Sequence, residues 1–520
     1  MTKEKKRVLI LVGVAALLLC ILVGGLVWFF TNHVFVSGKF YPKNAQMLNL
    51  RGRKISLAEY DALHEKFPNC TIFWDVPFQS RSYPEDTEQI TVTSLAREDI
   101  VALAHLPELK TLHAAGCRDY SVIAEVQTRF PNLEVLYTVP VDGTEYPQDA
   151  TSLTISRLTD SEVELMDYLP RLTTVDASGC RDYDQLLALQ QRRPELTVTY
   201  QVELLGKTYP GDTTALDFSN PDVAQLKSGL KYLPKVESVT MGDPSADAED
   251  LRDLMATYPA VEFYWEKTFF GKTHSTADKE IDYSNIAISS PNEVKQAMRY
   301  FPNAEKVVLS NCGMDNETMS AFRDEMRQEY KVVWTVYITK VPVRTDVTIF
   351  HSSGLHVCLV NEMSYDLKYL EDLVILDIGH SYIKYIDWIA YMPELKYVIL
   401  ADNWLMDISP ISNCKKMIYL ELFMNPHLKD ISPLVECTAL EDVNFARTFI
   451  NPEPLAQMPW LKNLWINMVE LTPEQRKLLS DSLPDTHIEF DYGFPTGGGW
   501  RELQNYYDMR DMMGLPKNHW

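Results

Sequence analysis

Cysteine is the residue with chemical potential that recurs most regularly in this sequence. The string GCRDY occurs at residues 116–120 and again at 179–183. Thiols in such a pattern could ligate a metal or form a bridge, but the chain has no C-x-x-C pair, which argues against a zinc site. Cysteines at equivalent repeat positions 63 residues apart would lie in non-adjacent coils, too far apart to bridge. We therefore expect structural free thiols that point inward, namely Cys117, Cys180, Cys312, Cys414 and Cys437.

Two further clusters have simpler explanations than metal binding or catalysis. DPSADAED (243–250) could bind calcium, but it lacks the glycine that a calcium-binding loop needs, so acids that open a helix are favoured. HSSGLH (351–356) has two His and two Ser without an acid spaced to orient them. H-E-x-x-H, G-x-S-x-G and Walker motifs are absent from the sequence. We expect no enzyme, no cofactor and no metal site.

Bulk composition indicates a folded, acidic chain. Hydrophobic residues make up 46% and charged residues 23%, which is typical of globular proteins. At 520 residues, one compact domain would be unusual. The net charge of −23 argues against nucleic acid as a partner, because phosphate backbones are bound by a surplus of Lys and Arg.

The N-terminus predicts a membrane anchor. Residues 1–7 (MTKEKKR) form a basic stub, and residues 8–30 carry no charge. As a helix, this run would be roughly 35 Å long, enough to span a bilayer. The basic flank favours a cytoplasmic N-terminus, with a linker at 31–43 and everything beyond it outside the cytoplasm. A cleaved signal peptide is the alternative, but the run is long and no A-x-A-like site follows it.

A repeated module accounts for the recurrence of GCRDY. A unit of about 63–68 residues recurs from roughly 85 to 345, with a truncated copy at 44–84. Each unit combines short alternating strand patterns with helical patterns. Such a unit cannot bury its own apolar faces, so the copies must stack as a solenoid. The series that sets the period comprises FPNCTIFW (67–74), FPNLEVLY (130–137), RPELTVTY (193–200) and YPAVEFYW (258–265).

Within the long module, leucines follow the spacing L-x-x-L-x-L-x-x-C or -N. The same spacing recurs at a shorter period in the chain after the long modules. In the long module this spacing fits Leu109, Leu112, Ala114 and Cys117. Downstream the period shortens to 21–23 residues, in copies headed by Leu373, Leu395, Met417, Leu440 and Leu461, and DISP occurs at 407–410 and 430–433.

This pattern resembles the leucine-rich repeat, and the short copies are similar to those of internalin-type bacterial surface proteins. The resemblance implies an α/β solenoid with parallel strands on one face and helices on the other. Long modules would occupy 44–345 and short repeats 346–490. A glycine hinge and a capping helix would follow at 491–520.

The strand face of the short repeats is the candidate binding site. Residues between the leucines should point away from the core, and exposed aromatic side chains on one face favour a binding surface. The alternative is that the C-terminal tail covers them. The candidate set is Tyr397, Ile399, Tyr419, Glu421, Phe423, Asp442, Asn444 and Trp465.

The expected function follows from this resemblance and from the anchor. We expect a bacterial, single-pass cell-membrane protein, held in the membrane by residues 8–30, with its repeats outside the cytoplasm. Those repeats would recognise a protein or peptide at the cell surface. A cell-wall or glycan-binding scaffold is the alternative, because aromatic faces also stack on sugars.

Overall fold

The computed structural model describes residues 3–355 and 357–516 of the chain. It forms two compact units, Met1–Thr214 with Gln225–Val236, and Ala215–Ala224 with Glu237–Trp520. Both units mix helices with short, mostly parallel strands. The α/β class expected from the sequence is confirmed.

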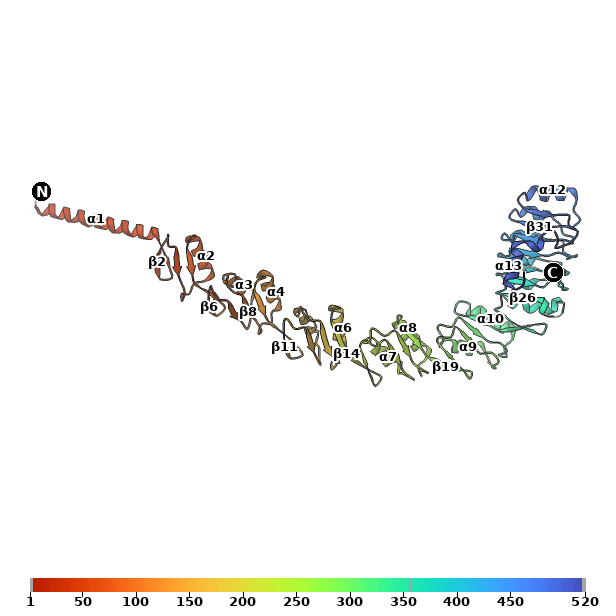
Figure 1. The fold of residues 1–520 in the computed structure, drawn as a ribbon, viewed down its shortest axis with the longest axis horizontal. Coiled ribbons are helices and arrows are strands. Elements are labelled where there is room, and N and C mark those ends of the chain that lie inside the picture. The colour runs from red at the N-terminus through yellow and green to blue at the C-terminus, as the bar shows by residue number, and fades with distance from the viewer. Residues whose placement is uncertain (1–2, 356, 517–520) are drawn as a thin grey trace. The chain divides into compact units, whose positions relative to one another are not determined.

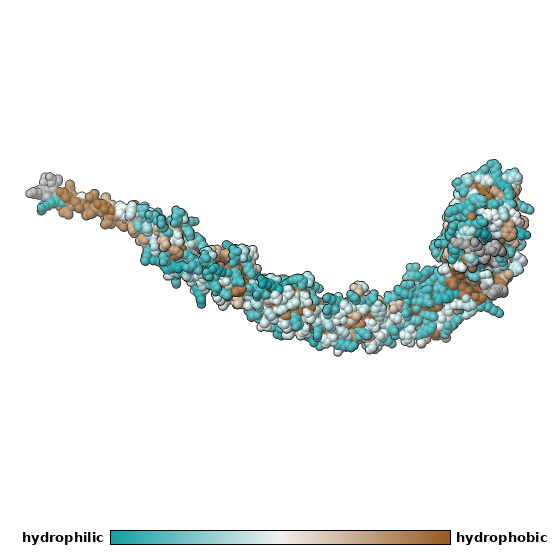
Figure 2. Space-filling view, in the orientation of Figure 1, coloured by the Kyte–Doolittle hydropathy of each residue, from teal (hydrophilic) through white to brown (hydrophobic). Residues whose placement is uncertain are grey.

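The N-terminal helix α1 runs from Lys3 to Asn32. Its segment Arg7–Asn32 contains an 18-residue window with a mean hydropathy of 3.0 and is long and apolar enough to cross a membrane, a test that a signal sequence also passes. Figure 2 shows this helix as a brown, apolar segment. The expected linker at 31–43 contains a hairpin of β1 (His33–Val36) and β2 (Lys39–Pro42).

Each complete long module holds three parallel strands joined by two helices. In the module at 89–136, α3 (Arg97–Leu103) joins β7 to β8, and α4 (Tyr120–Arg129) joins β8 to β9. The parallel strands of the long modules are β3 (Met47–Asn49), β4 (Thr71–Phe73), β7 (Gln89–Thr91), β8 (Thr111–His113), β9 (Glu134–Leu136), β12 (Ser152–Thr154), β13 (Thr174–Ala177), β14 (Thr197–Leu204), β16 (Ala215–Asp217), β17 (Ser238–Thr240), β18 (Glu262–Tyr264), β21 (Glu280–Asp282), β22 (Lys306–Val308) and β23 (Lys331–Val333). Their other helices are α2 (Leu57–Lys66), α5 (Asp160–Leu165), η1 (Met166–Tyr168), α6 (Tyr183–Arg192), α7 (Val223–Leu230), α8 (Ala248–Thr257), α9 (Pro291–Met298) and α10 (Asn316–Met326).

A β-hairpin follows each set of parallel strands and ends its sheet. The hairpins are β5 (Asp75–Phe78) with β6 (Arg81–Pro84), β10 (Thr138–Val141) with β11 (Thr144–Pro147), the end of β14 with β15 (Lys207–Pro210), β19 (Glu266–Phe269) with β20 (Lys272–Ser275), and β24 (Thr335–Ile338) with β25 (Val341–Arg344). Asp142 and Gly143, with φ of 47° and 72°, provide the two left-handed residues that a tight two-residue hairpin turn needs. The long modules therefore form separate sheets of two to four strands rather than one continuous ladder.

The short repeats share a single seven-stranded parallel sheet, which Figure 1 shows in the cyan-to-blue part of the ribbon. Its strands are β26 (Ile349–His351), β27 (Ile375–Asp377), β28 (Tyr397–Ile399), β29 (Tyr419–Glu421), β30 (Asp442–Asn444), β31 (Asn463–Trp465) and β32 (His487–Glu489). Short 3₁₀ turns replace most of the expected helices: η2 (Ser352–Leu355), η3 (Tyr365–Tyr369), η4 (Asp387–Tyr391), η5 (Ser409–Asn413), η6 (Ser432–Glu436) and η7 (Glu453–Gln457). The α-helices of this part are α11 (Asn361–Ser364) and α12 (Pro473–Ser482). A period of about 22 residues leaves room for little more than one such turn in each coil.

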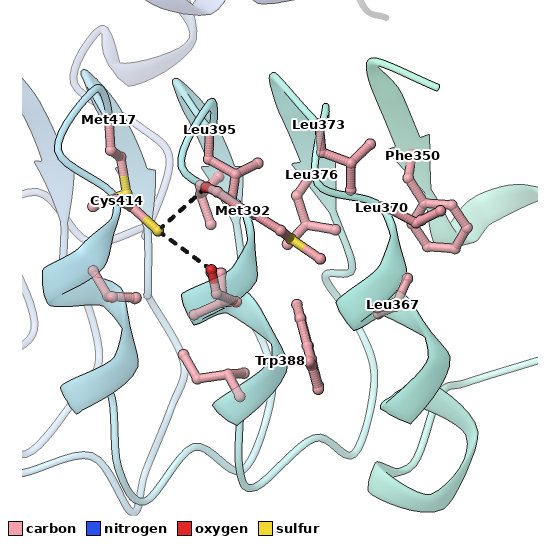
Figure 3. Packing of buried hydrophobic residues seen from close by; sticks show 14 of the residues in the cluster. Phe350, Leu367, Leu370, Leu373, Leu376, Trp388, Met392, Leu395, Cys414 and Met417 are labelled. Atoms are coloured by element: carbon pink, nitrogen blue, oxygen red, sulfur yellow. Dashed lines mark hydrogen bonds between the residues drawn. The ribbon is translucent and has the colours of Figure 1, made fainter. Parts of the chain in front are cut away.

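The leucines of the repeat build the core of this sheet, as the spacing predicts. Figure 3 shows Leu373, Leu376 and Leu395 packed between the strands and the turns, beside Cys414. The Cys414 thiol donates to the carbonyls of Ile389 at 3.7 Å and Met392 at 3.9 Å.

The five cysteines expected to be structural are free and buried, which confirms that expectation.

The acidic stretch at 243–250 also opens a helix as expected. Asp247 caps α8 and accepts hydrogen bonds from the backbone amides of Glu249 and Asp250.

Buried asparagines close the turn of successive coils. The Asn425 side-chain amide donates to the carbonyls of Leu400 at 3.0 Å and Leu422 at 2.9 Å, and its oxygen accepts from the amide of Leu405. Asn403 makes the same set of contacts one coil earlier. These bonds satisfy backbone groups that a tight turn leaves without partners.

Candidate binding surfaces of the short repeats

The eight strand-face candidates lie together, but they are not open to solvent. Seven of them are buried, and Ile399 is half-buried. Tyr419 and Glu421 are both 0% exposed. The C-terminal tail covers most of the set, through η8 (Trp500–Glu502) and α13 (Gln504–Met512). Of the two arrangements that the sequence allowed, the structure has the covered one.

Aromatic side chains form the apolar part of this contact. The Trp500 ring stacks on Tyr419 with centroids 5.0 Å apart, and it lies 5.2 Å from the Trp465 ring. Tyr506 of α13 packs beside them, and so does Tyr397 of β28. Trp500 is fully buried, so the tail inserts it into the strand face as an anchor.

Phe423 belongs to a different cluster. It packs with Ala401 and Ala446 and with the half-buried Ile399. Phe423 therefore lies beside the aromatic contact of the tail rather than within it, whereas Ile399 packs against both clusters.

A buried ion pair forms the polar centre of the contact. Arg501 donates to Glu421 through both terminal guanidinium nitrogens, Nη1 and Nη2, and Nη2 lies 3.1 Å from Oε2. Trp500 Nε1 donates to Glu421 Oε1 at 2.9 Å, and the Tyr419 hydroxyl donates to the same oxygen. Every donor around Glu421 except Tyr419 comes from the tail.

Amide side chains on the strands hold the backbone of the tail. Asn444 Nδ2 donates to the carbonyl of Pro495 at 3.0 Å, and Trp465 Nε1 donates to that of Gly497 at 2.7 Å. Asn467 Nδ2 donates to the carbonyls of Tyr492 and Phe494.

In the reverse direction, Asn505 of α13 donates to the carboxylates of Glu441 at 3.1 Å and Asp442 at 2.9 Å. The strand side chains thus form hydrogen bonds with both the main chain and the side chains of the tail.

The glycines that were expected to form a hinge form a packed turn. A Cβ on Gly497 would lie 1.9 Å from the ring of Tyr492. Gly498 and Gly499 have φ of 68° and 94°, conformations that other residues rarely adopt. The helix after them was expected as a cap. Its side chains pack against the strand face, with Tyr506 beside Tyr419 and Met509 in the same cluster.

Carboxylates on the strand face exceed the cations that the tail brings. Burial raises the pKa of Asp377 on β27, and the nearby Glu421 adds to this rise. Burial also raises the pKa of Asp442 on β30, although Asn463 and Asn505 donate to its carboxylate. Arg501 reaches Glu421, whereas Arg510 donates to the carbonyl of Pro516 within the tail.

A second aromatic surface lies on the loops that follow the strands, and it is open. Tyr382, Trp404 and Phe449 are 50%, 44% and 59% exposed. The Tyr382 and Trp404 rings lie edge to face at 5.4 Å, and Trp404 lies 6.3 Å from His427. We did not predict this row from the sequence. The available signal was an aromatic residue directly after Ser381, Asn403 and Thr448, the residues that close three of the coils.

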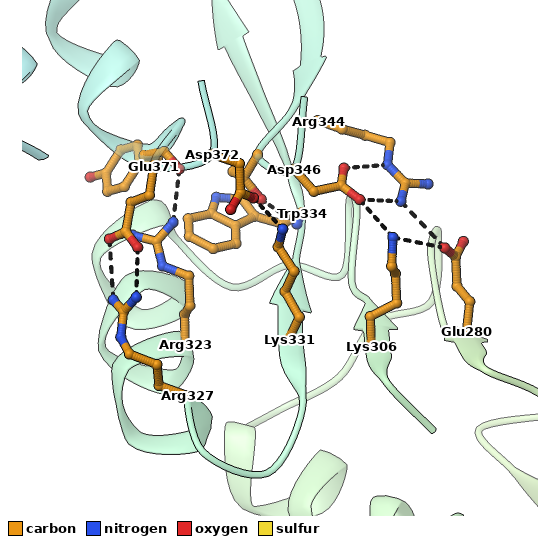
Figure 4. Close-up of polar contacts among 12 residues, drawn as sticks. Glu280, Lys306, Arg323, Arg327, Lys331, Trp334, Arg344, Asp346, Glu371 and Asp372 are labelled. Atoms are coloured by element: carbon orange, nitrogen blue, oxygen red, sulfur yellow. Dashed lines mark hydrogen bonds and ion pairs between the residues drawn. The ribbon is translucent and has the colours of Figure 1, made fainter. Parts of the chain in front are cut away.

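An ionic network joins the last long module to the first short repeat (Figure 4). Asp346 accepts from Arg344 at 2.9 Å and from Lys306 at 3.0 Å. Arg323, which is only 7% exposed, donates to the carbonyl of Tyr369 and pairs with Glu371. These cations have acidic partners within the network, so the ion pairs of Arg323 with Glu371 and of Lys331 with Asp372 connect the two repeats.

Among residues 3–355 and 357–516, no group of three or more His, Cys, Asp or Glu side chains could hold a metal ion. In HSSGLH, His351 Nδ1 lies 2.7 Å from the Ser353 hydroxyl, and His356 falls outside the described residues.

The parallel ladder, the inward leucines and the buried asparagines define a leucine-rich-repeat fold. Among solved structures, this chain is similar to an internalin (InlF) of Listeria monocytogenes, with 13% identity over 79% of this chain and 84% of that one, at a TM-score of 0.23. It is also similar to a leucine-rich-repeat protein of Leptospira interrogans, with 12% identity over 77% and 93% and a TM-score of 0.25.

A third similar structure is the complex of TLR13 with single-stranded RNA, with 14% identity over 82% of this chain and 64% of that one, at a TM-score of 0.24. The global superpositions are poor, so the fold assignment rests on the ladder itself. No protein-family model matches the sequence, and no curated protein matches it.

Proposed function

We propose that this chain is a single-pass bacterial membrane protein whose repeats lie outside the cytoplasm and recognise a protein or peptide. The apolar helix α1 and the basic residues before it support an uncleaved anchor with a cytoplasmic N-terminus. The leucine-rich-repeat fold supports a recognition role, because it presents many side chains on one regular surface.

One observation carries the recognition proposal. The strand face already holds a chain segment through an aromatic anchor, a charge pair and amide contacts, as the Trp500–Arg501 segment shows. These are the contacts that a peptide-binding surface uses. The proposed binding residues remain Tyr397, Ile399, Tyr419, Glu421, Phe423, Asp442, Asn444 and Trp465.

The anchor is tested by N-terminal sequencing of the protein purified from membranes. We expect the intact N-terminus, recovered with the membranes after an alkaline wash. A mature start near residue 35 would show that α1 is a cleaved signal peptide.

The ligand class is tested by presenting the detergent-solubilised full-length protein with a displayed random peptide library and with purified wall polysaccharide. We expect enrichment of peptides and no retention by polysaccharide. Retention by polysaccharide alone would replace the peptide proposal with the glycan one.

A glycan-binding scaffold is the second candidate, and the open aromatic row favours it. The Tyr382 and Trp404 rings are in contact with each other and exposed on successive coils. If glycans bind there, Trp404→Ala should abolish retention on wall polysaccharide, whereas Phe494→Ala, which removes an exposed ring of the tail, should not.

A further inference from the structure

We infer that the strand face of β29–β31 is a docking site for a basic peptide that presents a tryptophan–arginine pair, and that residues 494–512 occupy this site as a built-in competitor. This inference rests on the proposed recognition function and specifies its ligand. Four features of the contact between the tail and the strands carry it.

The tail is held as a bound peptide would be, and not as a further strand or coil. The backbone-to-backbone hydrogen bonds of residues 494–516 that the structure describes stay within the tail, for example from the amide of Glu502 to the carbonyl of Gly499 and from the amide of Leu515 to the carbonyl of Arg510. Strand pairing ends at β32. Side chains therefore carry the hydrogen bonds across the contact, which lets the tail leave without breaking the ladder.

Specificity comes from two adjacent tail residues. Trp500 lies against Tyr419 and Trp465, and Arg501 meets Glu421 with both nitrogens. Glu421 is fully buried, so a segment without a cation at this position would leave a buried charge without its partner. A competing peptide needs the same pair of residues.

Charge decides which peptide would compete best. The strand face presents Asp377, Glu421 and Asp442, and Glu441 lies beside them. Lys462 already pairs with Glu441, and the tail segment places its one cation, Arg501, on Glu421, while it itself carries Glu502, Asp508 and Asp511. A peptide with basic residues in place of those acids would neutralise the face more completely.

Some buried polar atoms at the contact between the tail and the strands also lack hydrogen-bond partners. Among the residues that the structure describes, Asn467 Oδ1 and Arg510 Nη2 are buried without a hydrogen-bond partner. Each such group weakens the closed state relative to a ligand that could satisfy it. The tail therefore has properties expected of a competitor that can be displaced.

The test uses the full-length protein in detergent and a fluorescent peptide with the sequence of residues 494–513. Two variants open the site. Trp500→Ala with Arg501→Gln removes the anchors of the tail, and Gly499→Val strains a turn at φ 94° while leaving every contact side chain in place. We expect both variants to bind the peptide at least about ten-fold more tightly than the wild type does.

Matched changes test the chemistry of recognition. The peptide carrying Arg501→Gln should bind at least about ten-fold more weakly, and so should an opened variant carrying Glu421→Gln. A peptide with Asp508→Lys and Asp511→Lys should bind more tightly. Tyr391→Ala, which removes an exposed aromatic ring elsewhere, should behave as the wild type.

Three results would overturn the inference. In the first, the opened variants stay folded and do not bind the tail peptide. In the second, they bind the Arg501→Gln peptide as tightly as the unchanged tail peptide. In the third, both opened variants unfold, which would make the tail an integral part of the fold. If the tail peptide binds but no library peptide does, the docking site stands and recognition of an outside partner fails. If a library peptide binds wild type and opened variants equally and the tail peptide does not compete, recognition stands and the docking site fails.

Discussion

Arg501 and Glu421 are 80 residues apart in the sequence and form a charge pair with two nitrogen–oxygen contacts beneath Trp500. Glu421 is completely buried, whereas the Arg501 side chain is 35% exposed. The pair therefore joins a carboxylate that water cannot reach to a cation that water can. Removing the cation should cost more than the pair itself contributes, because it leaves a buried charge without compensation.

We expect Arg501→Ala to lower the free energy of unfolding by about 2–3 kcal/mol, somewhat less than for a fully buried pair, since Trp500 and Tyr419 still donate to Glu421. Urea denaturation monitored by tryptophan fluorescence measures this loss. Arg476→Ala is the matched control, because its pair with Asp491 is exposed and should contribute less than about 1 kcal/mol. Equal losses in the two variants would contradict the buried pair.

The aromatic contact predicts a second loss of stability. Tyr419→Ala with Trp465→Ala should lower the melting temperature markedly, because each removes a fully buried ring, and such changes cost about 3–5 kcal/mol each. A chain that ends at Gly493 should lose stability in the same transition. Thermal melts of the three proteins provide the comparison. Identical melting temperatures for the wild type and the double variant would show that the strand face is open.

The ionic network predicts a pH-dependent contribution from Asp346. Burial alone would raise the pKa of this carboxyl, but hydrogen bonds from Arg344 and Lys306 outweigh burial and lower the pKa from 3.8 to about 2. A lowered pKa means that the folded state favours the charged form. The resulting stabilisation, about 2 kcal/mol, is present above pH ~4 and is lost as the pH falls towards 2.

Asp346→Asn should therefore be less stable than the wild type at pH 7, and the difference should shrink between pH 4 and pH 2. Urea midpoints measured across this range test the expectation. Asp481→Asn, which affects an exposed pair with Lys477, is the control and should show little difference at any pH. A constant difference for Asp346→Asn would rule out the linkage.

The buried cysteines should remain unreactive thiols. Burial raises the pKa of Cys414 to about 12 and that of Cys437 to about 11, so the nucleophilic thiolate is rare at neutral pH. Under native conditions iodoacetamide should modify the exposed Cys358 and spare these two. Mass spectrometry under denaturing, non-reducing conditions should find all of them free. A bridge between Cys117 and Cys180 would contradict their structural role.

The sequence predicts the repeating parts well because each has a strictly local signature. Leu376, Val398 and Leu420 recur with the period of the coil, and the structure places all three in the core. Asn403 and Asn425 occupy the position where a tight turn needs side-chain partners for its backbone, and they supply them. Repetition multiplies a weak local signal until it determines the fold.

The covering of the strand face could not be predicted in the same way. The tail pattern shows an apolar side, but the surface it meets lies some 80 residues earlier in the chain, and no periodicity links the two. The hairpins of the long modules show in the sequence only as alternating strand patterns, and their effect on the sheets depends on strand pairing, which only the structure shows. Tyr382 and Trp404 were missed because their exposure depends on a turn geometry that the leucine spacing does not specify.

The hairpin that ends each sheet has a consequence for how this chain can change in length. Strands β9 and β12 belong to neighbouring long modules but to different sheets, with β10 and β11 between them. Excising one whole period, for example residues 139–201, would therefore remove a sheet together with its own edges rather than split a ladder. Gain or loss of such a period would alter the distance along the chain between α1 and the short repeats in steps of one module. The seven-stranded sheet has no such breakpoints, so the part that carries the proposed site would keep its size while the part before it varied.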